Sequence, residues 1–71
     1  MVYMGNIVKE HTDLIDGESI SLKFGNGDEI IINPEDKLEK QNGDLKIVRS
    51  NRIVYVDTAF IKFVVKRRRF L

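Results

Sequence analysis

The chain has 71 residues, a net charge of +1, 32% charged residues and 42% hydrophobic residues, which is the composition of one small folded domain rather than of a disordered chain. It contains no cysteine and a single histidine, His11, so disulfides, thiolate metal sites and a metal cage of several histidines are excluded. Because domains of this size are marginal by themselves, stability must come from close packing or from self-association.

The beginning of the chain gives the weakest structural signal. Residues 2–8 are compatible with a strand and residues 12–15 with a short helical turn, and Asp16-Gly17 reads as a turn ahead of the first clear strand. No basic segment followed by a long apolar stretch opens the chain, and no apolar run approaches the ~20 residues that cross a bilayer. We therefore expect a soluble, cytoplasmic protein without a signal peptide.

A β-hairpin is the clearest local feature. In residues 18–24 three apolar side chains alternate with polar ones, as in a half-buried strand. The next four residues, Gly25-Asn26-Gly27-Asp28, contain the Asn-Gly pair that suits a tight hairpin turn. Residues 29–33 are then predicted to return as the second strand.

The segment from residue 34 to residue 41 is predicted to form one or two helical turns. Asn33-Pro34-Glu35-Asp36 joins an N-cap residue, a proline suited to the first helical position and two acids that complement the positive end of a helix. Leu38 is the only apolar side chain before Gly43, so this helix would lie on the surface. A plain acidic loop is the alternative interpretation.

Three further strands are predicted at residues 44–49, 52–57 and 61–66. A turn at Ser50-Asn51 separates the first two, and residues 58–60 fit a single 3₁₀ turn before the third. The second of these strands is β-branched and aromatic, the strongest strand composition in the chain. It is apolar on both faces, as is the strand at 29–33, which fits a central strand of a curled sheet, a covered strand or an interface.

Together these elements predict a mainly β fold. The expected architecture is a small five- to six-stranded antiparallel barrel or curled sheet, with one short helix or helical turn near 34–41. Residues 1–66 would form the single domain, and residues 67–71 a basic C-terminal tail.

The order of elements over residues 18–66 resembles an SH3-like barrel and, within that group, the Sm-like proteins. Leu22 to Ile32 looks like their strand–turn–strand with a central Asn-Gly, and Arg52 to Val65 looks like their last two strands joined by a 3₁₀ turn. The bacterial Sm-like RNA chaperones carry a Lys-His pair just after the Tyr-containing strand. This chain has Val56-Asp57 there, and the acid argues against the same uridine-binding pore. The strand from Arg52 to Asp57 also resembles a DNA-binding β-domain of the LytTR type.

The charges are unevenly distributed along the chain. Residues 1–44 hold four basic and ten acidic side chains, a net of −6, whereas residues 45–71 hold eight basic ones and a single acid, a net of +7. A basic patch of this kind can neutralise phosphates, but a basic terminus can also pair with the acidic first part of the chain. The candidate site for nucleic acid or an acidic partner comprises eight cations and one aromatic residue: Lys46, Arg49, Arg52, Lys62, Lys66, Arg67, Arg68, Arg69 and Tyr55.

No catalytic, cofactor-binding or metal-binding set emerges from the sequence. His11 lies near two acids, but no nucleophile motif surrounds any serine, so a solvent-exposed histidine is the simpler interpretation. Asp13, Asp16 and Glu18 lack the loop of a calcium site, and Gly25-Asn26-Gly27 lacks the lysine of a phosphate loop. We therefore expect a protein that is not an enzyme and takes no cofactor and no small-molecule substrate.

Three binding hypotheses remain open. The first is a small regulatory or adaptor protein, of a kind that a mobile element could carry, that acts through protein–protein contacts; its bipolar charge would favour oriented docking. The second is a nucleic-acid-binding module that uses the basic C-terminal third, with Tyr55 or Phe70 able to stack a base. The third is a homo-oligomer, held either by salt-sensitive charge pairing or by apolar contacts through Ile31, Val54 and Val56.

Overall fold

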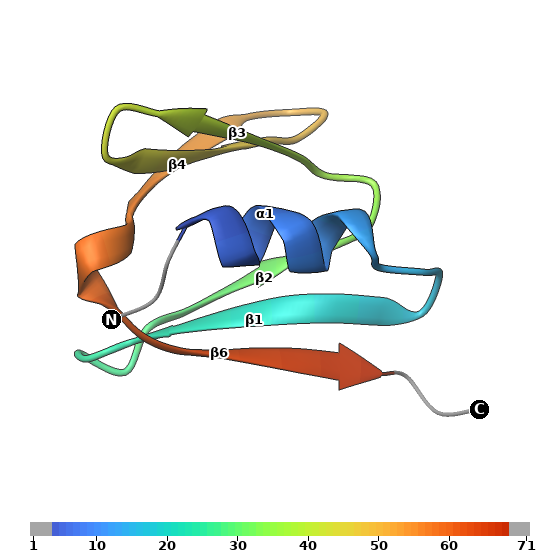
Figure 1. Ribbon diagram of the computed structural model, residues 1–71, viewed down its shortest axis with the longest axis horizontal. Coiled ribbons are helices and arrows are strands. Elements are labelled where there is room, and N and C mark those ends of the chain that lie inside the picture. The colour runs from blue at the N-terminus through green and yellow to red at the C-terminus, as the bar shows by residue number, and fades with distance from the viewer. Residues whose placement is uncertain (1–3, 69–71) are drawn as a thin grey trace.

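The computed structural model describes residues 4–68. In these residues one short helix and a 3₁₀ turn accompany six strands (Figure 1). In chain order the elements are α1 (Met4–Thr12), β1 (Glu18–Phe24), β2 (Glu29–Ile32), β3 (Lys37–Gln41), β4 (Asp44–Val48), β5 (Ile53–Asp57), η1 (Thr58–Phe60) and β6 (Ile61–Arg68).

The strands form two antiparallel sheets of three strands each. Their orders are β2-β1-β6 and β3-β4-β5, so β2 and β6 are the edges of one sheet, and β3 and β5 are the edges of the other. The prediction of a mainly β, antiparallel fold is confirmed. The two sheets do not close into one barrel, so the closed form of that prediction is wrong for the described residues.

The hairpin predicted at residues 18–33 is confirmed. β1 and β2 pair with Leu22 opposite Ile30. In the turn, Gly27 has a φ of 94°, a value that glycine adopts without a steric penalty. The side-chain oxygen of Asn26 accepts a hydrogen bond from the backbone N–H of Asp28 at 2.9 Å, so the Asn-Gly sequence supplies both requirements of the turn.

The helix predicted at residues 34–41 is wrong, because this segment contains a turn followed by β3. The backbone N–H of Asp36 donates to the carbonyl of Asn33 at 3.1 Å, and the Asp36 carboxylate accepts from the N–H of Asn33 at 2.9 Å. The capping residues therefore close a tight turn instead of starting a helix. Leu38 then pairs opposite Ile47 of β4, which places the only apolar side chain of the segment against the core.

The expectations for the beginning of the chain are also wrong within the described residues. A helix, α1, replaces the strand expected at 2–8, of which residues 2 and 3 lie outside the described range. This helix ends at Thr12 and a turn follows at Asp13, so residues 12–15 form no separate helical turn. Met4, Ile7 and Val8 are spaced so that they share one side of the helix. Ile7 is only 1% exposed, and the other two pack against the core.

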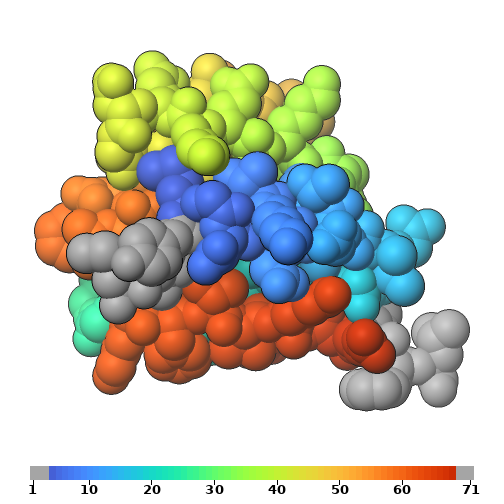
Figure 2. Space-filling view, in the orientation of Figure 1, coloured from blue at the N-terminus to red at the C-terminus, as the bar shows by residue number. Residues whose placement is uncertain are grey.

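The helix lies between the two sheets and belongs to the core of the molecule. Figure 1 shows α1 crossing in front of β2, and Figure 2 shows its side chains filling the face between β3 and β6. The core that it covers combines apolar side chains from both sheets and from α1. These are Ile7, Ile20, Leu22, Ile32, Leu45, Ile47, Val56 and Ile61.

The last strand is longer than predicted. β6 extends through Arg67 and Arg68, which pair opposite Ser19 and Glu18 of β1. The boundary predicted between a domain ending at residue 66 and a tail therefore falls inside a strand, and residues 69–71 lie outside the described range. Within residues 4–68, the only helices are too short and too polar to span a membrane.

Candidate functional site

Most of the predicted basic site is neutralised by the acidic first part of the chain. Seven of its eight cations lie in the described residues, and five of these form ion pairs with carboxylates of residues 1–44. The five pairs are Lys46–Glu39, Arg49–Asp36, Lys66–Glu18, Arg67–Glu29 and Arg68–Glu18. The five pairs involve four of the ten acidic side chains of residues 1–44, so the charge asymmetry along the chain is cancelled in part.

Glu18 is the centre of one cluster of these pairs. Its side chain is only 7% exposed, and its carboxylate lies 3.7 Å from Lys66 and 3.1 Å from Arg68. It also accepts a hydrogen bond from the backbone N–H of Ile15 at 3.1 Å. This backbone hydrogen bond, together with the two cations, lowers the pKa of Glu18 against the opposing effect of burial. Glu18 therefore ties the loop after α1 to the end of β6.

Glu29 is the centre of a second cluster, on the outer face of the sheet β2-β1-β6. Its carboxylate accepts a hydrogen bond from the buried Ser21 hydroxyl and lies 2.9 Å from Lys23 and 3.2 Å from Arg67. The hydrogen bond from Ser21 and the nearby Lys23 lower the pKa of Glu29. Arg67 is thus engaged with β2, although the sequence placed it in a basic C-terminal tail.

Arg49 connects the two sheets. It follows β4, and its guanidinium donates a hydrogen bond to the carbonyl of Ile31 in β2. The same group lies 3.5 Å from the carboxylate of Asp36, which is buried in the turn after β2. Arg49 is therefore a structural brace between the sheets.

The remaining members of the predicted site do not form one continuous patch. Arg52 and Lys62 are exposed and have no ion pair within residues 4–68, and Arg69 lies outside that range. Lys46 and Tyr55 lie opposite each other on β4 and β5, whereas the run that ends at Arg68 lies on β6 in the other sheet. The cations of the predicted site are therefore divided between the two sheets.

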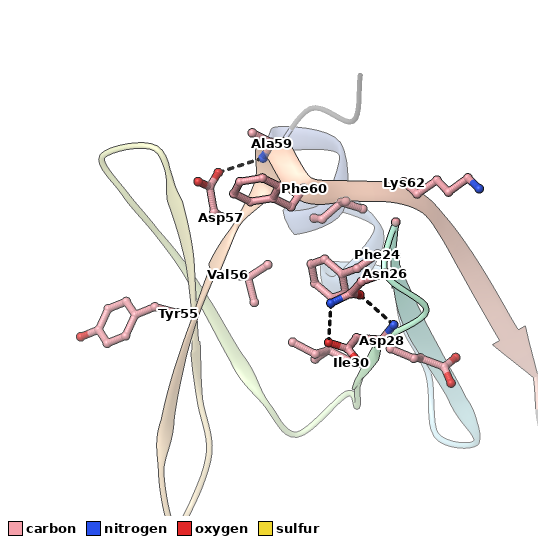
Figure 3. Close-up of a pocket in the computed structure, with 13 residues that line it drawn as sticks. Phe24, Asn26, Asp28, Ile30, Tyr55, Val56, Asp57, Ala59, Phe60 and Lys62 are labelled. Carbon is pink, nitrogen blue, oxygen red and sulfur yellow. Dashed lines mark hydrogen bonds between the residues drawn. The ribbon is translucent and has the colours of Figure 1, made fainter.

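A different feature stands out in the described part of the chain. An open groove, here termed the seam, separates the edge strand β2 from the edge strand β5. It consists of two adjoining cavities of about 840 Å³ and 610 Å³, both lined by Glu29 and Ile30. In Figure 3, Phe24, Ile30 and Val56 point toward one another across the larger cavity. The seam is thus an entrance to the apolar interior.

Large apolar side chains surround the seam. Phe60 in η1 is 70% exposed and lines the larger cavity. Tyr55 is 56% exposed and points away from the cavity onto the outer face of β5 (Figure 3). Sequence reasoning named Tyr55 as a site residue but missed the aromatic pair Phe24 and Phe60. The available signal was the 3₁₀ turn predicted at 58–60, which turns a phenylalanine outward.

Comparison with known proteins gave no further guide. Neither a protein-family model, nor a curated protein, nor a solved structure matches the chain.

Within residues 4–68, no three metal-ligating side chains gather into a candidate metal centre. His11 lies with its Nε2 atom 3.0 Å from the carbonyl of Asn33, so the imidazole connects α1 to the end of β2. The seam offers apolar walls, strand edges and a few charges, which are the means of recognising another polypeptide.

Proposed function

We propose that this protein is a small cytoplasmic binding domain that acts through protein–protein contacts and has no catalytic role. The observation that carries this proposal is the open seam with exposed Tyr55 and Phe60 beside it. Aromatic side chains exposed next to an apolar groove are characteristic of protein interfaces. The absence of cysteine supports a reducing compartment.

We further propose that the domain is a variant of the SH3-like or Sm-like architecture. The support is the order of elements: a hairpin with a central Asn-Gly turn, then further antiparallel strands, and a 3₁₀ turn, η1, between β5 and β6. In this interpretation β2 and β3 correspond to one strongly bent strand, interrupted by the turn at Asn33 and Pro34. The seam is then the place where a barrel of this kind stays open.

Nucleic-acid binding is the weaker candidate. Phosphate contacts need cations that are free to exchange their counterions. Five of the seven described cations of the predicted site already face carboxylates of the same chain. Arg52 and Lys62 provide too little positive charge for a phosphate-binding surface by themselves.

The test of this proposal uses the protein as bait for its cellular partners. Wild-type protein is compared with Tyr55→Glu and with Lys37→Glu, an equally exposed change on the far edge strand β3. A partner captured by the wild type and by Lys37→Glu, but lost with Tyr55→Glu, is then purified and its binding measured directly. We expect that pattern, together with no binding of labelled single- or double-stranded oligonucleotides at low salt.

Two results would contradict the proposal. One is tight, salt-sensitive oligonucleotide binding by the wild type. The other is a set of captured proteins that does not differ between Tyr55→Glu and Lys37→Glu. Light scattering on the same samples identifies the case in which the partner is a second copy of the chain.

A further inference from the structure

We propose that the seam binds an extended peptide of a partner protein, which adds as a strand to the free edge of β5. This inference rests on the protein-binding function proposed above and names the kind of partner segment that it takes. It follows from three properties of the seam: its backbone edges, its apolar interior and the opposite charges at its two ends.

The outer edge of β5 can form backbone hydrogen bonds to a further strand. The N–H of Arg49 donates to the carbonyl of Arg52 at 2.9 Å. In the antiparallel pair of β4 and β5 this bond fixes the alternation of hydrogen-bonded residues. The backbone N–H and C=O groups of residues 54 and 56 face β4, whereas those of residues 53, 55 and 57 face away from β4. Within residues 4–68, β5 has no neighbour on that side, so Ile53 and Tyr55 present unpaired donors and acceptors.

The opposite wall of the seam is less able to pair. By the same alternation, Glu29 and Ile31 of β2 direct their backbone groups away from β1. The carbonyl of Ile31 is already taken by the guanidinium of Arg49. A guest strand would therefore hydrogen-bond to β5, while β2 forms the far wall of the groove.

The interior of the seam selects for apolar side chains. Val56 points into it, toward Phe24 and Ile30 (Figure 3), and Val54 lines the adjoining cavity. Side chains of a strand alternate between its two faces. Two apolar guest residues placed opposite Val54 and Val56 would thus enter the core side, and the residue between them would lie beside Tyr55 on the outer face.

The ends of the seam carry opposite charges. Asp28 and Asp57 line the larger cavity, and neither has an ion pair within residues 4–68. Arg52 lines the other cavity, beside Arg49. Lys62 also belongs to the larger cavity, but its amino group points away from it in Figure 3. An antiparallel guest would therefore begin with a cation at Asp57 and end with an acid at Arg52.

These properties define a probe, the blocked hexapeptide Lys-Val-Thr-Val-Thr-Glu. Run antiparallel to β5, its lysine faces Asp57, its two valines face Val56 and Val54, and its glutamate faces Arg52. The matched control is Glu-Val-Thr-Val-Thr-Lys, which has the same composition with the end charges exchanged. A second control carries an N-methyl group on the central threonine opposite Tyr55, which removes the N–H that would pair with β5.

Titration of the ¹⁵N-labelled protein with these peptides, followed by amide chemical shifts, tests the inference. We expect the probe to shift the amides of Ile53–Asp57 and of Glu29–Ile31, and the N-methylated peptide to shift neither set. Arg52→Glu should weaken probe binding about fivefold and bind the charge-exchanged peptide better. Lys37→Glu, the same charge change on β3, should leave both affinities unchanged.

The outcomes that overturn the inference are distinct from those that overturn the protein-binding function. If millimolar probe shifts no β5 amide, or if N-methylation has no effect, strand addition in the seam is wrong. A purified partner that still distinguishes Tyr55→Glu from the wild type would then leave the protein-binding function standing. A dimer of the protein that blocks the probe would assign the seam to a second copy and would also overturn the inference.

Discussion

At the scale of single residues, the buried carboxylates determine the positions of the cationic side chains that pair with them. Glu18 lies opposite Arg68 on the paired strands β1 and β6 and is nearly excluded from water. A buried carboxylate requires hydrogen bonds or counter-charges. It therefore holds the end of β6 against β1. No local sequence pattern indicates that a carboxylate at the start of a strand pairs with cations 48 to 50 residues later.

Replacing Glu18 with Gln should reduce the pH dependence of stability. The fold lowers the pKa of Glu18 below its ordinary value of 4.5. Its contribution is thus fully present above pH 4.5 and is lost as the pH falls through the lower pKa of the folded state. Urea midpoints measured at pH 7 and at pH 3 should differ less in Glu18→Gln than in the wild type. The control is Glu10→Gln on α1, and equal pH dependence in all three proteins would contradict the role given to Glu18.

Replacing Arg49 with Met should destabilise the fold by about 1–3 kcal/mol, because the variant leaves the carbonyl of Ile31 without its donor and the buried carboxylate of Asp36 without its counter-charge. Arg52→Met, three residues later and exposed, should cost no more than about 0.5 kcal/mol. Urea unfolding of both variants measures the difference. If the two costs were equal, Arg49 would not connect the sheets.

At the scale of elements, local sequence patterns predicted the structure correctly where it depends on a single turn or a single strand. The hairpin of β1 and β2 follows from alternation and from Asn26-Gly27. The helix predicted after Asn33 was wrong because the residues that can cap a helix can also close a turn. Pairing of this segment with β4 favours the turn and the strand over the helix. The helix α1 was missed because three apolar residues, Met4, Ile7 and Val8, are too few to define a helical pattern in the sequence. Their shared side of the helix becomes important only when the two sheets provide a surface for it to cover.

The turn of the first hairpin gives an element-scale prediction. Gly27 has a φ of 94°, where any side chain is strained, so Gly27→Ala should lower the free energy of unfolding by about 1–2 kcal/mol. Gly25 lies in the same turn outside that region and has open space around it, so Gly25→Ala is the matched control and should be tolerated. Thermal unfolding compares them, and an equal loss in both variants would show that the turn does not depend on the left-handed residue.

The docking of α1 gives another prediction. Ile7 is almost completely buried between the sheets, so Ile7→Ala should cost about 2–5 kcal/mol. Lys9→Ala, on the exposed side of the same helix, controls for any change in helix propensity and should cost little. Chemical denaturation provides both values. A small cost for Ile7→Ala would mean that α1 is peripheral to the core.

At the scale of the whole molecule, two halves of opposite charge fold onto each other. The first 44 residues carry a net of −6 and the rest a net of +7, and sequence reasoning left open whether the cations meet a partner or their own chain. In the described residues, five of these cations form ion pairs with carboxylates of their own chain. The seam was not predictable, since it arises where two sheets fail to meet. The surface that the proposed partner would meet is therefore mainly apolar, with one strand edge.

The most direct test of this account is an NMR titration of the side-chain carboxyl groups of Glu18 and Glu29 in the folded protein. Both groups should titrate below the ordinary value of 4.5, because hydrogen bonds and the cations of β1 and β6 favour their charged forms. Titration of both groups at or above that value would show that these carboxylates do not hold the cations.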